Sequence, residues 1–504
     1  MMLKGLEVEL LEKQPFHMPT LEEMMASMGD GGPGGPGGPG GPGGPGGPGG
    51  PGGPGGPGGP GGPGGPGGPD GPGAGGPPGM SAPGTPSVKI DHGVLQREDM
   101  LSQYVFGGEF EDDYATDVRI VTYDGDVGGI FATGAGEYEV DGATISLSGK
   151  GAGLGTERAG AASYDHAILT LRNANIYTNG QAKCCTSAEE YSVLKVYDST
   201  LISMGAPFGD DAPEASKGTS SPPAALEIAG NTRTHCTQSN SYSYFYNSTI
   251  IGDGWAALST DGSMGFVRLE ASSCKVITTK SGYGTYADGC CHNEFCDCDF
   301  DVASMAGIMA GECDITYKNC CCKCGTYFNM IHCVMGVKEE VGVLKCLTCD
   351  VECKSDAVIV KSQNADITFD RCSIFAENGV LVHSIVNDDP NATKTGGAKV
   401  YGIRVNLLNG SYEGDMIHED TDRDMIVTID AQSSLVGALK HCYLKLEEGA
   451  KWIALSDSDV VIMDGFDPAA VDAPEGVVIK ALAAESGSFD LASGGKLVVD
   501  CPAK

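Results

Sequence analysis

The stretch ITYKNCCCKC, residues 315–324, carries the pattern from which the fold is predicted. Apolar residues alternate with polar ones, a polar turn at Asn319 follows, and a second alternating run begins directly after it. Alternation with a period of two is typical of a β-strand that has one buried face. The stretch therefore predicts two short strands joined by a tight polar corner.

The same template recurs along most of the chain, mostly at intervals of roughly 22 to 29 residues, with wider gaps where loops intervene. The other copies are LTLRNANIYT (169–178), LKVYDSTLIS (194–203), YFYNSTIIGD (244–253), VRLEASSCKV (267–276), EFCDCDFDV (294–302), LKCLTCDVEC (344–353) and ITFDRCSIFA (367–376). A period near two dozen residues with several short strands in each period predicts a stacked solenoid. Successive coils would add strands to parallel sheets about 4.8 Å apart.

This repeat resembles the right-handed parallel β-helix family, which includes pectate-lyase-like enzymes, polysaccharide-binding proteins and adhesins. The resemblance covers about residues 120–500 and concerns the repeat pattern alone. It implies an all-β fold, a right-handed parallel β-helix. Leucine-rich and WD40 arrays are disfavoured, because the sequence has neither the L-x-x-L-x-L-x-x-N frame nor a Trp-Asp pair in each repeat.

The composition divides the chain into four expected segments: 1–30, 31–79, 80–118 and 119–504. The first is expected to form short helices that dock a partner, and the third to be a linker and N-terminal cap of the β-helix. The second is dominated by Gly-Gly-Pro triplets, which exclude helix and sheet interiors. It is expected to be a linker, a collagen-like triple helix or a packed glycine-rich layer. Residues 1–79 would accordingly join a partner subunit or three copies of the chain.

Acidic residues outnumber basic ones by 67 to 32, which gives a net charge of −35. This charge argues against nucleic acid or an anionic membrane as a partner. No apolar run reaches membrane-spanning length, and the first residues lack the pattern of a secretory signal. We therefore expect a cytoplasmic protein whose 20 cysteines are thiols or metal ligands rather than disulfides.

Stacking converts sequence spacing into columns of neighbouring side chains. Four cysteines fall at the same corner position of consecutive coils and predict a structural thiol ladder: Cys298, Cys320, Cys349 and Cys372. The ladder either packs a tight corner or supplies thiolate ligands. Cys274 and Cys322 are expected at an inward core position instead.

A second predicted column comes from the strand ends NMIH (329–332), VIVK (358–361), VLVH (380–383) and DMIH (415–418). It would place His332, Lys361, His383 and His418 in one outward file, with Asp288 two coils earlier. Stacked cations at about 5 Å repel each other unless a metal, an anion or a carboxylate intervenes. The column is therefore either a functional site or a coincidence of spacing.

Soft ligands, methionines among them, lie near this column in the sequence. Thiolate and thioether donors favour Cu(I), whereas imidazole binds copper and zinc alike, so copper is expected first and zinc second. The predicted metal ligands are His292, His332, His383, His418, Cys291, Cys313 and Cys333. Lys361 and Asp288 are the predicted catalytic residues.

The favoured function is a metal-dependent oxidoreductase or transferase that acts on a small polyhydroxylated substrate, phenolic or sugar-like. The alternatives are a carbohydrate-binding or adhesin-like β-helix without catalysis, and a polysaccharide lyase. The alternating acids Asp297, Asp299 and Asp301 are either a carboxylate cluster for glycoside hydrolysis or ordinary surface residues.

Overall fold

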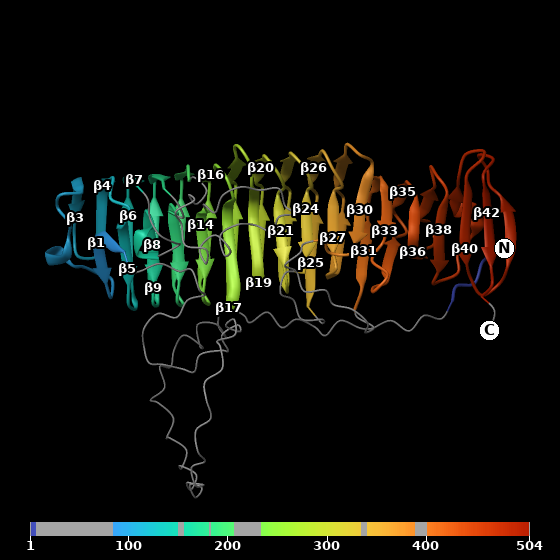
Figure 1. The fold of residues 1–504 in the computed structure, drawn as a ribbon, viewed down its shortest axis with the longest axis horizontal. Helices are drawn as coiled ribbons and strands as arrows, with labels where there is room; N and C mark the ends of the chain where they lie inside the picture. The colour runs from blue at the N-terminus through green and yellow to red at the C-terminus, as the bar shows by residue number, and fades with distance from the viewer. Residues whose placement is uncertain are drawn as a thin grey trace, which may run out of the picture. The chain divides into compact units, whose positions relative to one another are not determined.

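The chain winds into a parallel β-helix whose strands stack coil upon coil along its length (Figure 1). In the central coils the strand pairings form three parallel stacks, which we call the first, second and third sheet. The computed structural model describes residues 2–6, 84–149, 156–180, 183–205, 233–333, 340–388 and 401–502, which all belong to one compact unit. The predicted parallel β-helix is thereby confirmed as a fold. The remaining residues, including nearly all of the segments predicted as 1–30 and 31–79, lie outside the described part.

The first sheet contains the strand that opens each coil. In order it consists of β1 (Thr85–Asp91), β5 (Val127–Thr133), β8 (Ala161–Tyr164), β11 (Thr186–Glu189), β14 (Arg233–Gln238), the first halves of β17 (Ala256–Ser272) and β19 (Tyr283–Cys296), β21 (Gly307–Ala310), β24 (Asn329–His332), β27 (Val358–Lys361), β30 (Val380–Ile385), β33 (Asp415–His418) and the start of β36 (Leu439–Leu446).

The second sheet follows the first around the coil. It consists of the start of β4 (Tyr114–Thr122), β6 (Gly136–Asp141), β9 (Ala167–Arg172), β12 (Val193–Tyr197), β15 (Tyr242–Tyr246), the second halves of β17 and β19, β22 (Cys313–Lys318), β25 (Val341–Leu347), β28 (Asn364–Asp370), β31 (Ile403–Leu408), β34 (Met425–Ile429), the end of β36, β38 (Ser458–Ile462), β40 (Val478–Leu482) and β42 (Lys496–Asp500).

The third sheet closes each coil. It consists of the end of β4, β7 (Thr144–Ser148), β10 (Asn175–Asn179), β13 (Thr200–Ser203), β16 (Thr249–Gly252), β18 (Lys275–Thr278), β20 (Asp299–Val302), β23 (Cys321–Cys324), β26 (Asp350–Cys353) and β29 (Ser373–Ala376). Later coils use a separate four-stranded parallel sheet of β32 (Ser411–Glu413), β35 (Ser434–Val436), β37 (Lys451–Ile453) and β39 (Val471–Asp472).

Three short strands pair antiparallel: β2 (Val94–Leu95) with β1, β3 (Val105–Phe110) with β4, and β41 (Gly487–Asp490) with β42. The described residues also include the 3-10 helices η1 (Arg97–Asp99), η2 (Thr156–Arg158) and η4 (Pro468–Ala470). Because β1 already stacks in parallel on β5, the first coil begins inside the segment 80–118 that was predicted as linker and cap.

The corner between the second and third sheets depends on one residue with left-handed backbone geometry. Asn173, Asn247 and Asn319 have φ of 49°, 46° and 51° at this position. Asparagine tolerates this region better than most residues, which explains the polar turn in the repeat. The side chains also connect coils, since the Asn319 amide nitrogen donates to an Asp297 carboxylate oxygen one coil earlier, at 2.5 Å.

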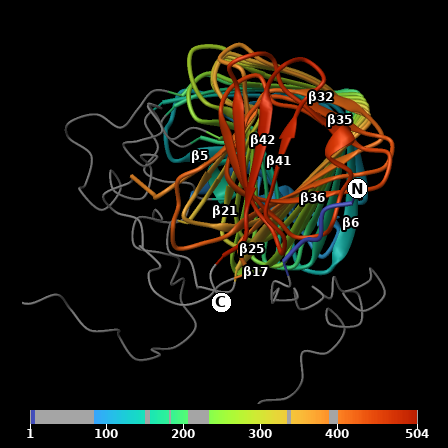
Figure 2. The same ribbon diagram turned by 90° about the vertical axis from the view of Figure 1, so that its right-hand side faces the viewer.

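The coils enclose a single continuous core, and the end-on view shows strands on its several sides (Figure 2). Aromatic side chains stack within it from coil to coil. Phe295 and Tyr317 stack with ring centroids 5.3 Å apart, and Phe300 meets Phe295 edge-on at 5.1 Å. Stacking of like residues follows from the register, because each core position lies directly above its equivalent in the previous coil.

The N-terminal residues 2–6 pack against the C-terminal coils of the β-helix. The Leu3 amide donates to the Phe466 carbonyl at 2.9 Å, and the Leu6 amide donates to the Ile462 carbonyl at 2.8 Å. Leu3 is 2% exposed and belongs to the main core. These residues belong to the predicted helical docking segment, but they are not helical. They dock as an extended chain on the C-terminal coils.

Two glycines allow this docking. A Cβ on Gly5 would lie 1.9 Å from the Met463 carbonyl oxygen, and a Cβ on Gly465 would lie 1.9 Å from the Leu3 carbonyl oxygen. On the other side of the segment, the Lys4 carbonyl accepts the Ala484 amide at 3.1 Å. The N-terminal segment is therefore inserted between two backbones that leave no room for a side chain.

We expect Gly465→Ala to release residues 2–6 from the β-helix, because the added methyl group overlaps the Leu3 carbonyl. Hydrogen exchange should accelerate at the Leu3, Leu6 and Ala484 amides, and the midpoint of thermal unfolding should fall. Lys4→Ala serves as the control, since its side chain is 75% exposed. Unchanged exchange in the Gly465→Ala protein would contradict the docking.

Candidate functional site

One outward position of the first sheet carries polar and titratable residues on successive coils. The register places them in the order Gln238, Asp261, Asp288, Ala310, His332, Lys361 and Ile385, which we call the polar column. The predicted shared position of Asp288, His332 and Lys361 is confirmed, including the two-coil step between Asp288 and His332. The column extends further toward the N-terminus than the sequence indicated.

The prediction was wrong for His383 and His418. His383 pairs with Ile359 rather than Lys361, because β30 is longer than β27 and reaches Ile385 at the column position. His418 pairs with Ser384, whose strand position alternates to the inward face. Neither imidazole stands in the polar column.

These two histidines have other partners. His383 Nδ1 lies 3.0 Å from an Asp356 carboxylate oxygen, and this hydrogen bond raises the pKa of the imidazole. His418 Nε2 hydrogen-bonds the Arg423 carbonyl oxygen at 2.9 Å, while burial lowers its pKa. Both contacts hold local loops in place.

The N-terminal half of the column is a half-buried pair of carboxyl groups, Asp261 and Asp288, on adjacent strands. Burial, together with a smaller contribution from the neighbouring Asp261 charge, raises the pKa of Asp288 to about 6. The Tyr286 hydroxyl donates to Asp288 Oδ2 at 3.1 Å. Burial raises the pKa of Tyr286 well above its ordinary value, so this hydroxyl remains a donor. Asp288 therefore stays protonated to a higher pH than an ordinary aspartic acid does.

Aromatic side chains surround Tyr286 on the same outer face. Its ring centroid is 5.0 Å from that of Trp255 and 5.8 Å from that of Tyr283. The guanidinium of Arg233 lies over the Trp255 ring at 4.1 Å. These aromatic rings shield the adjacent Asp288 carboxyl from water, which explains why burial outweighs the Arg233 charge in setting its pKa.

The C-terminal half of the column is more deeply buried. His332 is 1% exposed, and burial together with the Lys361 charge lowers its pKa to about 4. Lys361 Nζ forms an ion pair with Asp388 at 2.7 Å. Three coil steps of about 4.8 Å separate Lys361 from Asp288, on the order of 14 Å. The two predicted catalytic residues share a column but cannot act on the same atom.

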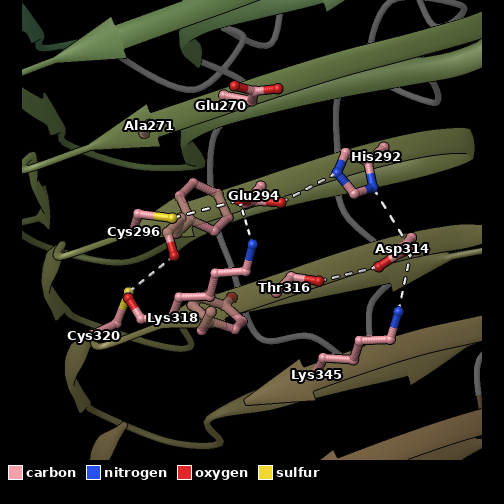
Figure 3. Close-up of polar contacts among 12 residues, drawn as sticks. Glu270, Ala271, His292, Glu294, Cys296, Asp314, Thr316, Lys318, Cys320 and Lys345 are labelled. Carbon is pink, nitrogen blue, oxygen red and sulfur yellow. Dashed lines mark hydrogen bonds and ion pairs between the residues drawn. The ribbon is translucent and has the colours of Figure 1, made fainter. Parts of the chain in front are cut away.

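The predicted metal ligands lie on different faces. His292 is on the outer face of the second sheet, between Glu294 and Asp314, with ring nitrogens 3.8 and 3.6 Å from their carboxylate oxygens (Figure 3). Cys291 and Cys313 pair in register on the inward face. The described residues therefore do not assemble the predicted set of ligands.

The inward thiols are hydrogen-bond donors to the backbone. The Cys291 thiol donates to the Asp288 carbonyl at 2.8 Å, and Cys313 donates to the Ala310 carbonyl at 3.2 Å. Burial raises the pKa of Cys313 well above its ordinary value, which disfavours the thiolate that a metal needs. Cys333 is likewise buried in the coil that follows. Across the described ranges, no group of three or more His, Cys, Asp or Glu residues is arranged to hold a metal ion.

The second-sheet cluster around His292 is an ion-pair ladder. Lys318 Nζ contacts Glu294 at 2.6 Å, and Lys345 Nζ lies 3.9 Å from Asp314 (Figure 3). Glu294 and Asp314 thus each have a lysine on the next strand of the sheet. Alternating charges of this kind stabilise stacked strands without requiring a ligand.

The four cysteines of the predicted thiol ladder do lie at one corner of consecutive coils. Cys274 is a fifth member of this ladder. Cys298 donates to the Cys296 carbonyl at 3.2 Å, and Cys274 makes the same contact with the Ser272 carbonyl at 3.2 Å. Cys274 therefore belongs to the corner, not to the core position predicted for it. Cys322 does occupy that core position, in register with Phe300.

Earlier coils have serine at the corner: Ser199 and Ser248 donate to the carbonyl two residues before them, at 2.6 and 2.9 Å. We accordingly expect Cys320→Ser to change the free energy of unfolding by less than about 1 kcal/mol. Cys322→Ser should cost about 1–3 kcal/mol, because its hydroxyl would be buried among apolar side chains. Urea unfolding measures both. Equal losses would contradict a hydrogen-bonded corner ladder.

The repeat pattern did not single out Asp261 or Tyr286, although the sequence contains a local signal for them. The segments STDG (259–262) and YADG (286–289) both end in Asp-Gly, and the structure pairs them residue by residue. Gly289 has φ of 71°, so the glycine marks the corner after the first sheet. An Asp-Gly pair at one corner of two successive coils would have indicated the acid pair.

No protein family, no curated protein sequence and no solved structure matches this chain. The resemblance to pectate-lyase-like enzymes is therefore supported only as a β-helix scaffold. Among the described residues, no helix is long and apolar enough to cross a membrane.

Proposed function

We propose that this chain cleaves glycosidic bonds in a polyhydroxylated substrate, with Asp288 as the proton donor and Asp261 as the second carboxylate. The observation that carries the proposal is the in-register pairing of two half-buried carboxyl groups, one with a pKa raised to about 6. Paired carboxyl groups of unequal acidity are what hydrolysis of a glycoside requires.

The geometry favours a double displacement. Adjacent strands lie about 4.8 Å apart, close to the ~5–5.5 Å between carboxyl groups of retaining glycosidases. Asp288 would give its proton to the glycosidic oxygen as the bond to the anomeric carbon breaks, while an Asp261 oxygen bonds to that carbon. Water, losing a proton to Asp288, would then displace Asp261 and restore both groups. The anomeric configuration is retained.

Substitutions separate the two roles. Asp288→Asn should lower kcat about 10²- to 10⁴-fold on an alkyl glycoside, and much less on a dinitrophenyl glycoside that needs no proton. Asp261→Asn should impair both substrates, because it removes the group that attacks carbon. Rates are measured on a panel of α- and β-glycosides, with Asp299→Asn, an exposed acid of the third sheet, as the matched control.

Two outcomes would overturn the proposal: turnover that survives both substitutions, or no turnover of any glycoside in the panel. Sugar binding without turnover would instead support the non-catalytic carbohydrate-binding function.

The pH dependence follows from the same pKa. The proton on Asp288 is present below about pH 6 and lost above it, so kcat/KM should fall as the pH rises through this value. Asp261→Asn removes a charge that raises this pKa, and the pKa of Asp288 should decrease. Carboxyl ¹³C NMR titration of both proteins measures the shift. An unchanged pKa would show that the two carboxyl groups do not interact.

A further inference from the structure

A groove runs along the end of the third sheet, on a different part of the coil from the polar column. It has a volume of about 390 Å³ and follows five consecutive strands, from β18 to β29. This volume lies within the range of small-molecule sites. The groove is not needed for the acid pair and is available for a separate ligand.

The groove is deep where Gly325 lines it, because this residue has no side chain to fill the space. A Cβ on Gly325 would lie 2.0 Å from the Ala303 carbonyl oxygen, so no side chain fits between these two coils. The strand residues beneath, Val302 and Cys324, are buried and belong to the core. The depression is thus built into the backbone.

One wall carries alternating charges. Asp301, Lys323 and Glu352 pair in register on consecutive coils and are exposed. Lys354 and Glu377 line the groove beyond them. Within the described part of the chain, no ion pair joins any of these five residues to another. Their charged ends are free to contact a ligand.

An aromatic side chain closes the wall. Phe375 follows Glu352 in register and is 60% exposed. A large apolar ring at a groove end offers a flat surface on which a ligand ring can stack.

We propose that this groove binds an uncharged oligosaccharide that lies along the β-helix axis. A polyanion would meet Asp301 and Glu352, and a polycation would meet Lys323, so a ligand of one charge is repelled on alternate coils. Hydroxyl groups, in contrast, accept hydrogen bonds from lysine and donate them to carboxylates. A sugar ring packs against Phe375. The proposal is independent of the acid pair, because it concerns binding on the third sheet.

Calorimetric titration of the full chain with cellohexaose, maltohexaose and mannohexaose tests the groove. We expect at least one neutral hexaose to bind, and hexagalacturonate and hexaglucosamine to bind at least tenfold more weakly. Phe375→Ala should weaken binding about three- to tenfold. Tyr177→Ala is the matched control, since Tyr177 is an exposed aromatic residue of the same outer face, on β10 outside the groove.

The location is overturned if Phe375→Ala and Tyr177→Ala have equal effects. The ligand class is overturned if no neutral hexaose binds at millimolar concentration, or if a charged hexamer binds best. Asp288→Asn should leave the affinity unchanged, and loss of binding in that variant would assign the sugar to the polar column instead. Failure of glycoside turnover with retained groove binding would leave this proposal intact.

Discussion

The constraint on which the rest of this structure depends is the in-register hydrogen bonding of each coil to the next. It requires every coil to turn at the same place, and a residue such as Asn319 adopts left-handed geometry there. Once the turn is fixed, strand alternation decides which side chains face the core and which face outward. Residues distant in sequence, such as Asp261 and His332, then occupy one column. Sites in this fold arise from register rather than from sequence motifs.

Register also makes the charge pattern of each face informative. On the second sheet, Glu294 contacts Lys318, so opposite charges meet and the stack is neutralised. In the polar column, Asp261 stands beside Asp288, where like charges on neighbouring strands are unfavourable. Glu270 and Glu294 on the second sheet are also in register, but Arg268 and Lys318 form ion pairs with them. The column positions on either side of Asp261 and Asp288 hold neither lysine nor arginine, although the same column contains Lys361 further along. Perturbed acidity concentrated in this way is typical of functional sites.

The sequence predicted the features that depend on constant coil geometry and missed those that depend on local irregularity. The thiol ladder and the pairing of His332 with Lys361 follow from equal strand lengths, and both were predictable. His383 was misplaced because β30 extends two residues beyond the template, with a register irregularity after Val380. The predicted metal site does not form for another reason. Strand alternation places Cys291 on the inward face and the next residue, His292, on the outward face. Cys291 and His292 are adjacent in the sequence, but they lie on opposite faces of the strand and cannot bind the same metal ion.

The acid pair owes its chemistry as much to its neighbours as to the carboxyl groups. Ala310 occupies the next position of the column after Asp288, and Gln238 occupies the position before Asp261. Neither side chain carries a charge, so the column supplies no cation next to the two acids. The Arg233 guanidinium, at the start of the adjacent strand β14, lowers the pKa of Asp288 by less than burial raises it. Where the column does contain a cation, Lys361, its charge is compensated by Asp388 and lies on the order of 14 Å away. Burial and the like charge can therefore keep the proton on Asp288, and uncharged residues on both sides of the pair are part of the site.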